Sequence, residues 1–525
     1  MSAQAADTSQ AEAGAIEPGR AEEPLILTLD VGTSSLRTML FDRRGRALHG
    51  FGARVTYDVR STTGGGVELD ADQIVESTAT AIDELLQQCG PLSAKIGAVA
   101  GDTFWHNLIA LDHEGHPLSP IFTWADTRAT AAAEQMKQEL DERAIHRRTG
   151  CVLHASYWPA KLRWLAAEQP DLIRRTVHWV SIGEYLHYRF LGQLHCSVSM
   201  ASGTGLLDQH TRRWDEELIA ALPLRTEQLS PLTDGSQPAG TPRAEFAKRW
   251  PALARIPWFP IAGDGACSNA GSGCTSRDRL ALMIGTSGAL RVCFPADDAE
   301  THWGLWCYHA NQDYFLLGGA LSNGGLLWEW LQRTLRLPDP AATEAALAGT
   351  EPDAHGLTVL PFLAGERSPN WNGHARAAFV GVSLNTQPLD FVRAGLEAVS
   401  YRFALIYELL RTVVPGSPQV IANGGAVLSS PLWMQMLADV LGAPVTASAE
   451  AEATSRGAAL LALLALGQTA TLDHRTLPAA LGRTYQPDAG RHQRYQAGAA
   501  RQRWLYDRLI SDQPSGISHQ PTEAT

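Results

Sequence analysis

The chain has 525 residues, with 43 lysines and arginines against 55 aspartates and glutamates, so its formal net charge is −12. This acidic balance argues against a protein whose main task is to bind nucleic acid or an anionic membrane, because both tasks need a basic surface. Hydrophobic residues make up 45% of the sequence, as in ordinary globular proteins, and the length suits two or three domains.

The seven cysteines are scattered and form no C-x-x-C pair, which favours buried free thiols over disulfides or a cysteine-rich zinc site. Residues 1–23 lack the basic and apolar segments of a signal peptide. The most apolar stretch, residues 457–467, is shorter than the ~20 residues that a membrane-spanning helix requires. We therefore expect a cytoplasmic protein without a membrane segment, with disordered tails at residues 1–23 and 512–525.

Strand and helix patterns alternate from residue 25 onward, which predicts an α/β protein. In the first half, Asp70 can cap a helix over residues 69–88 whose apolar side chains fall on one side. Apolar runs between turn residues predict strands over residues 25–29, 36–41, 47–55 and 95–100.

The second half continues the same alternation. Pro388 suits the first turn of a helix, and Gly467 suits a helix end. The predicted helices cover residues 388–413, 431–441 and 455–466, and the predicted strands cover residues 279–284, 289–294 and 419–422.

One short sequence occurs in both halves. Leu29-Asp30-Val31-Gly32-Thr33-Ser34 resembles Leu282-Met283-Ile284-Gly285-Thr286-Ser287, and in each case a predicted strand enters Gly-Thr-Ser and a second strand leaves it. Two unrelated hairpins could share these turn residues. A duplicated fold with one phosphate-binding hairpin in each domain is the interpretation we prefer.

The first Gly-Thr-Ser loop has the residue types that bind phosphate. Gly32 lets the backbone approach closely, and the amides and hydroxyls of Thr33, Ser34 and Ser35 can donate to phosphate oxygens. Asp30 would repel a phosphate but can hold Mg²⁺. An ordinary Asx turn is the alternative. The first loop and the second loop, which contains Gly285, Thr286 and Ser287, could bind a triphosphate from both sides. The chain has no Walker-type motif.

Two further turns carry candidate functional residues. Asp264 follows Gly263 among small residues, where its carboxylate could accept a proton from a hydroxyl, or could simply cap the following helix. The segment Asn423-Gly424-Gly425-Ala426 lies between a strand and a helix, where bare backbone could contact a base or ribose. A tight turn is the alternative for that segment.

Two other motifs are less informative. His113-Glu114-Gly115-His116 does not have the spacing of H-E-x-x-H, and the following Pro117 favours a hairpin turn over a metal site. The aromatic segment 303–314 could stack on a ligand, but buried packing in a sheet or hinge is the preferred interpretation.

In their order and spacing these segments resemble the motifs of the FGGY carbohydrate kinases, of the superfamily that includes actin and heat-shock ATPases. The resemblance covers residues 25–509. One departure is Ala377, where the family usually has glycine, and the side chain there limits the local backbone angles. Further matching segments are Thr123-Trp124-Ala125-Asp126-Thr127-Arg128, Gly365-Glu366-Arg367-Ser368-Pro369-Asn370-Trp371-Asn372, and Trp433, Gln435, Ala438-Asp439-Val440 and Gly442.

The resemblance implies an α/β fold of two actin-like (ribonuclease H-like) domains, at residues 24–256 and 257–511, with a catalytic cleft between them. ATP and Mg²⁺ would bind in the cleft, which would close around a polyhydroxy substrate. By position, Asp264 matches the catalytic base and Asp30 the carboxylate near the metal. The Gly-Thr-Ser loops match the phosphate-binding loops, and Gly424, Gly425 and Ala426 match the adenosine contact.

The resemblance also indicates substrate-binding residues: Trp105, His106, Asp126, Arg128, Gly263 and Asp264. A structural role for His106, and a bracing ion pair between Asp126 and Arg128, stay open as alternatives. The loops most resemble those of the gluconokinase branch, for which a cation such as Arg128 or Arg291 would attract the gluconate carboxylate.

We therefore expect transfer of the γ-phosphate of ATP to a hydroxyl of a small sugar or sugar acid, with gluconate converted to 6-phosphogluconate. A xylulokinase-like or other ketose or polyol kinase is the alternative, followed by an actin-like ATPase that phosphorylates no metabolite. We expect neither nucleic acid nor membrane as a partner, and the protein could form a homodimer.

Overall fold

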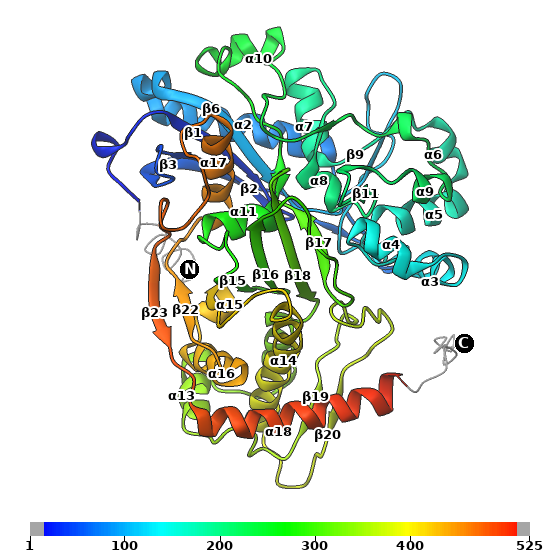
Figure 1. The fold of residues 1–525 in the computed structure, drawn as a ribbon, viewed down its shortest axis with the longest axis vertical. Helices are drawn as coiled ribbons and strands as arrows, with labels where there is room; N and C mark the ends of the chain where they lie inside the picture. Colours follow the sequence, from blue (N-terminus) through cyan, green and yellow to red (C-terminus); the bar gives the residue numbers. More distant parts are fainter. Residues whose placement is uncertain (1–14, 512–525) are drawn as a thin grey trace.

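The computed structural model describes residues 15–511 as two lobes, each built on a mixed β-sheet (Figure 1). The first sheet has the strand order β14 (Ala262–Gly263), β6 (Ile96–Thr103), β1 (Leu25–Val31), β2 (Ser35–Phe41) and β3 (Ala47–Thr56). The second has the order β17 (Trp306–His309), β18 (Tyr314–Leu321), β16 (Gly288–Pro295), β15 (Arg279–Ile284), β21 (Gln419–Asn423), β22 (Val445–Ser448) and β23 (Leu481–Tyr485).

The two sheets share one central topology. β1 is antiparallel to β2 and parallel to β6, and β15 is antiparallel to β16 and parallel to β21. The two Gly-Thr-Ser sequences therefore form equivalent hairpins at the centres of the two sheets. This correspondence confirms the duplicated architecture and the two-domain α/β fold that the sequence predicts.

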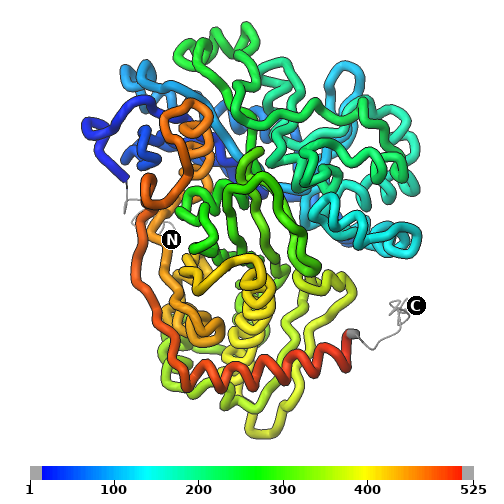
Figure 2. The backbone as a smooth tube through the Cα atoms, viewed as in Figure 1, coloured from blue at the N-terminus to red at the C-terminus, as the bar shows by residue number. Residues whose placement is uncertain are grey.

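Helices cover both faces of the first sheet. α2 (Ala71–Cys89) packs against β2 and β3, and Asp70 caps it by accepting a hydrogen bond from Gln73 N at 2.9 Å. α17 (Ala453–Ala465) packs against β1 and β6, although it comes from the second half of the chain. Figure 2 shows this excursion, in which the chain leaves β22, reaches the first lobe as α17 and returns as β23.

α17 crosses α11 (Asp264–Gly271) at very short range. A Cβ atom at Gly271 would lie 1.7 Å from the Ala453 carbonyl oxygen, and one at Gly457 would lie 1.8 Å from the Cys267 carbonyl oxygen. Arg456 strengthens the crossing, because its guanidinium is buried and donates to the carbonyl oxygens of Gly45 and Gly271.

A long insertion after β6 extends the first lobe. It has its own apolar core around Trp158 and Trp179, both fully buried. Its helices are α3 (Thr130–Glu139), α4 (Glu142–Thr149), α5 (Trp158–Glu168), α6 (Pro170–Arg175), α7 (Ile182–Leu191), α8 (Val198–Ser202), α9 (Glu216–Ala220) and α10 (Ala244–Arg249).

Short strands complete the two lobes. They pair as β4–β5–β8, β7–β9, β10–β13, β11–β12 and β19–β20. They are β4 (Arg60–Ser61), β5 (Val67–Leu69), β7 (Ile109–Leu111), β8 (Ile121–Phe122), β9 (His178–Val180), β10 (Cys196–Ser197), β11 (Leu207–Asp208), β12 (Arg213–Trp214), β13 (Leu232–Thr233), β19 (Thr358–Leu360) and β20 (Ala378–Val380).

The long helix α14 (Pro388–Leu410) lies against the second sheet and contributes much of that lobe's apolar core. α16 and α18 pack beside it, and α18 runs along the base of the lobe (Figure 1). The other helices of this lobe are α12 (Gly325–Thr334), α13 (Pro340–Ala348), α15 (Gly425–Leu428), α16 (Pro431–Leu441) and α18 (Ala489–Tyr506).

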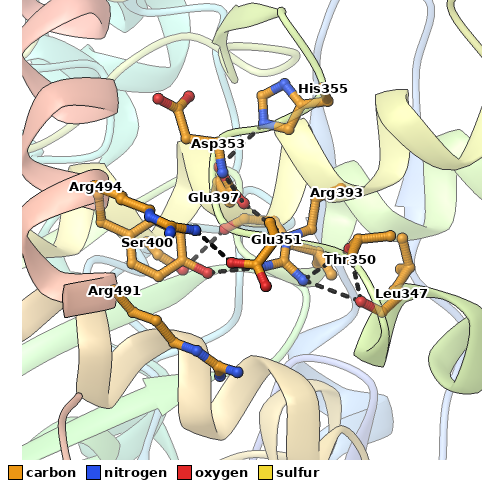
Figure 3. A network of polar contacts seen from close by, with 12 residues as sticks. Leu347, Thr350, Glu351, Asp353, His355, Arg393, Glu397, Ser400, Arg491 and Arg494 are labelled. Carbon is orange, nitrogen blue, oxygen red and sulfur yellow. Dashed lines mark hydrogen bonds and ion pairs between the residues drawn. The ribbon is translucent and has the colours of Figure 1, made fainter.

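A buried polar network joins α14 to α18 (Figure 3). Glu397 accepts hydrogen bonds from Arg393 Nε at 2.7 Å, His355 Nε2 at 3.0 Å and the Asp353 backbone amide at 3.3 Å. Arg393 also donates to the Tyr495 hydroxyl of α18 at 2.8 Å. The network stabilises this end of the lobe because every charged member has a partner.

Part of the N-terminal tail predicted to be disordered is ordered. Ile16 forms a bridge to Leu48 of β3, and Glu22 makes ion pairs with Arg43 and Arg44. The prediction is wrong for residues 15–23 because β3 is an edge strand whose free backbone groups can pair with the tail, which composition does not reveal. The remaining tail residues, 1–14 and 512–525, lie outside the described residues.

The transition between the lobes comes later than the predicted boundary at residues 256 and 257. β14 pairs in parallel with β6 of the first sheet, so the chain leaves that sheet only at α11. Among the described residues, none of the helices combines the length and apolarity that crossing a membrane requires.

We expect Gly457→Ala to destabilise the protein by more than the about 1–3 kcal/mol typical of overpacking, because its methyl group would meet backbone that cannot move aside. Differential scanning calorimetry would measure the change. Gly349→Ala is the matched control: Gly349 ends α13 at a φ of −85° with its nearest Cβ contact at 3.9 Å, so its effect should be small. Equal melting temperatures for the two variants would contradict the role assigned to the crossing.

Candidate active site

A cavity of about 420 Å³ lies between the lobes and is lined by residues of both. Asp264 and Arg291 line it together with the rings of Trp105, Trp306 and Tyr308, which we call the aromatic wall. Of the predicted phosphate-, nucleotide- and substrate-binding residues, Thr33, Trp105, His106, Asp264, Ser287 and Gly424 line the cavity, as does Arg291, which the sequence indicated as a partner for a carboxylate. The other predicted residues lie outside the lining: Asp30, Gly32, Ser34, Ser35, Asp126, Arg128, Gly263, Gly285, Thr286, Gly425 and Ala426.

The two Gly-Thr-Ser turns reach the cavity from opposite lobes. Gly32 N donates to Ser35 O at 3.0 Å, and Gly285 N donates to Ser287 O at 3.0 Å, so both turns close in a similar way. Thr33 and Ser287 line the cavity. Two hydroxyl-bearing turns are thereby placed to donate to one polyanionic ligand.

The second turn is supported by glycines of neighbouring loops. Gly424 has a φ of +101°, and a Cβ there would lie 2.4 Å from the Ile284 carbonyl oxygen. Gly325 N donates to the Gly285 carbonyl oxygen at 2.7 Å. The sequence analysis did not identify the Gly324-Gly325 pair. Two glycines at the start of a helix are a signal that could have indicated a close approach to another loop.

Asp264 is the first residue of α11, with Gly263 at the N-cap position. Its Oδ1 accepts a hydrogen bond from Gly265 N at 2.7 Å. Burial raises the pKa of Asp264, and the positive charge of Arg291 opposes that shift. Arg291 is itself buried and donates to the Gly265 carbonyl oxygen at 2.8 Å. The site therefore presents a buried carboxylate whose raised pKa is only partly opposed by the positive charge of Arg291.

The aromatic wall comes from both lobes. Trp105 packs edge-on against Tyr308 with ring centroids 5.0 Å apart, and Tyr308 stacks on Trp306 at 4.2 Å. Trp306 and Tyr308 belong to β17 and are buried, yet both line the cavity. These two residues of the segment 303–314 are packed in the sheet, as the preferred interpretation predicts, and their rings also line the cavity.

His106 adopts a left-handed φ of +65°, which is uncommon for a residue other than glycine. Burial and the positive charge of Arg367 lower the pKa of His106 well below its ordinary value, so the ring is neutral. Its Nδ1 bonds to the Gly203 carbonyl oxygen and must carry the proton, which leaves Nε2 as an acceptor. A substrate hydroxyl is a suitable donor to it.

Lys161 anchors the backbone of the loop that contains His106, and it was not predicted from the sequence. Its Nζ is buried and donates to the carbonyl oxygens of His106 and Ser156, each at 2.6 Å. Burial lowers the pKa of Lys161 to about 7. A lysine inside a helix carries no sequence signal for such a role.

Asp126 and Arg128 form a bracing pair beside the cavity. Arg128 Nε lies 3.0 Å from Asp126 Oδ1, and its Nη2 lies 2.7 Å from Glu68 Oε1. The guanidinium also stacks 4.6 Å above the Trp164 ring. Of the same segment, Trp124 is the residue that lines the cavity.

Carboxylates suited to a divalent cation lie near Asp264 but outside the cavity lining. Asp30 accepts a hydrogen bond from Ser455 Oγ at 3.4 Å, and burial raises its pKa against the charge of Arg37. Asp102, which was not among the predicted residues, pairs with Asp30 in the β1–β6 register. Burial and the Asp30 charge raise the pKa of Asp102 well above its ordinary value.

Two other clusters of potential metal ligands are explained without a metal. Asp353, His355 and Glu397 belong to the network of Figure 3, in which His355 Nδ1 also accepts a bond from Leu357 N. Asp112 accepts hydrogen bonds from the Glu114 and His116 amides in an exposed turn. The second cluster forms the hairpin turn that the sequence predicts.

Two models of one protein family match this chain. Residues 25–271 match the model of the N-terminal domain of the FGGY family of carbohydrate kinases, and residues 280–466 match that of its C-terminal domain. The gluconokinase of Bacillus licheniformis is 27% identical over 459 residues, which cover 85% of this chain and 89% of that protein.

Two solved structures are similar over nearly their whole length. The gluconate kinase from Lactobacillus acidophilus aligns with a TM-score of 0.85 and 28% identity, covering 93% of this chain and 98% of that one. The ligand-bound xylulose kinase from Lactobacillus acidophilus aligns with the same TM-score and 27% identity, covering 93% and 99%.

Proposed function

The chain belongs to the FGGY family of carbohydrate kinases and is an ATP-dependent sugar kinase, and we propose that its substrate is a small sugar acid, gluconate, which it converts to 6-phosphogluconate. The proposal includes Mg²⁺ as the metal and the cytoplasm as the location. All seven cysteines are buried and unpaired, which supports a reducing compartment.

The proposal of a sugar acid rests on Arg367, whose side chain has no hydrogen-bond or ion-pair partner among the described residues. It lines the cavity together with His106, Trp124 and Tyr308, and its Nε is buried without a hydrogen-bond partner. Within the described part of the chain, the Arg367 side chain makes no ion pair or hydrogen bond, and its guanidinium carbon lies 5.7 Å from the centre of the Trp371 ring.

The other arginines near the cavity are engaged. Arg37 pairs with Glu452 at 2.7 Å, the charge of Arg291 acts on Asp264, and Arg128 is bound to Asp126 and Glu68. A guanidinium without an anion favours a ligand that supplies one, and its planar fork matches a carboxylate. Arg367 thus replaces Arg128 and Arg291 as the proposed partner of the gluconate carboxylate.

In this proposal Asp264 accepts the proton of the attacking terminal hydroxyl as that oxygen bonds to the γ-phosphorus of ATP and the bond from this phosphorus to the departing ADP breaks. Thr33 and Ser287, with the amides of their turns, bind phosphate oxygens, and the loop at Gly424 contacts adenosine. Bound Mg²⁺ supplies the counter-charge for the phosphates, and Asp30 would hold it. The aromatic wall keeps water away from the reacting groups.

A neutral ketose such as xylulose is the second candidate, because a xylulose kinase structure aligns as well as a gluconate kinase structure. An uncharged substrate would leave the Arg367 charge without a partner in the closed site. Family membership argues against an ATPase that phosphorylates no metabolite.

We expect Arg367→Gln to lower kcat/KM for gluconate about ten- to hundredfold, as expected for the loss of a charged hydrogen bond worth about 1.5–3 kcal/mol. The values for xylulose and glycerol should hardly change. A coupled ADP-release assay over gluconate, xylulose, ribulose, fuculose and glycerol would measure both effects. Arg376→Gln, which changes an exposed arginine of the same loop, is the control. An absence of activity on gluconate would exclude the proposed substrate.

We expect Asp264→Asn to reduce turnover by about 10²–10⁴-fold, because an amide cannot accept the hydroxyl proton. ADP binding, measured by isothermal titration calorimetry, should persist. Because burial raises the pKa of Asp264, kcat/KM should decline on acidification at a pH above the ordinary aspartate value of about 3.9. Asp58→Asn, at an exposed position, is the control. Turnover that survives in Asp264→Asn would remove this residue from the role of base.

A further inference from the structure

Asp102 is a fully buried carboxylate whose state needs an explanation. It lies near the end of β6 with 0% of its surface exposed, and neither of its carboxylate oxygens has a hydrogen-bond partner among the described residues. Leaving a carboxylate in that state is very unfavourable, because burial removes its hydration without replacing it.

Its neighbours are also carboxylates. Asp102 pairs with Asp30 on the adjacent parallel strand β1, so the two side chains leave the same face of the sheet. On its other side Asp102 pairs with Ala262 of β14, two residues before Asp264. Three acidic residues therefore meet at the carboxyl ends of three adjacent strands.

The nearby arginines do not neutralise the negative charge of these three carboxylates. Arg37 forms an ion pair with Glu452, and Arg291 donates a hydrogen bond to the Gly265 carbonyl oxygen while its charge acts on Asp264. A proton shared between Asp30 and Asp102 would satisfy one oxygen of Asp102, whereas a cation with its bound water can satisfy both. Carboxylate oxygens are the ligands that Mg²⁺ and Mn²⁺ prefer.

We propose that Asp102 joins Asp30 in binding one divalent cation at the carboxyl ends of β1 and β6, so that the protein binds Mg²⁺ or Mn²⁺ before any nucleotide arrives. Sequence reasoning assigned the metal to Asp30 alone. A preloaded cation would order the base of the phosphate site, and this proposal does not depend on which sugar is the substrate.

The test is a titration of the full chain with Mn²⁺ in the absence of ATP and sugar, followed by electron paramagnetic resonance of the free ion. We expect one site in the wild type and a loss of affinity of about tenfold or more in Asp102→Asn. Asp30→Asn is the second variant and should lose the site as well, whereas Asp58→Asn should bind as the wild type does.

Circular dichroism and melting temperatures in EDTA would establish that each variant is folded. Mn²⁺ should raise the melting temperature of the wild type and leave that of Asp102→Asn unchanged. Binding that requires ATP, or equal affinity in the wild type and Asp102→Asn, would overturn the proposal and indicate a shared proton instead. Either result would leave the kinase assignment intact, because no phosphoryl transfer is measured.

Discussion

The crossing of α11 and α17 is the constraint on which the rest of the structure depends. Two backbones can approach this closely only where Gly271 and Gly457 carry no side chain. The crossing places Asp264, the first residue of α11, beside the first sheet, and it places Ser455 of α17 against Asp30. One contact between small residues thus brings Asp264 and Asp30, from distant parts of the chain, close enough to affect each other's charge.

The partners of the arginines near the cavity determine which of these arginines can bind a ligand anion. Arg37 and Arg128 form ion pairs with carboxylates of the protein itself, and Arg291 donates to the Gly265 carbonyl oxygen beside Asp264, so all three are less suited to capture a ligand anion. Arg367 has no such partner in the described part of the chain and faces the cavity. Arg367 is therefore better suited to bind a ligand anion than the arginines that already have a partner within the protein.

Local sequence was sufficient for most elements and for the chemistry of the turns. The predicted strand at residues 279–284 and the predicted helix at residues 431–441 match β15 and α16, because apolar periodicity and end residues are local signals. The prediction failed at residues 15–23, where order comes from pairing with a sheet edge. It also missed Arg367 and Asp102, since a guanidinium without a partner and a buried carboxylate without one are defined only by their neighbours.

The sequence by itself determined the α/β class, the repeated hairpin and the family, because these depend on short-range patterns and on the order of motifs. Only the tertiary structure decided which of the motif residues meet. Asp126 and Arg128 bind each other outside the cavity, whereas Trp306 and Arg367, far apart in the chain, both line it, and Asp102 lies beside Asp30. The physical reason is that partnership, burial and charge balance are properties of the packed chain, and no single segment contains them.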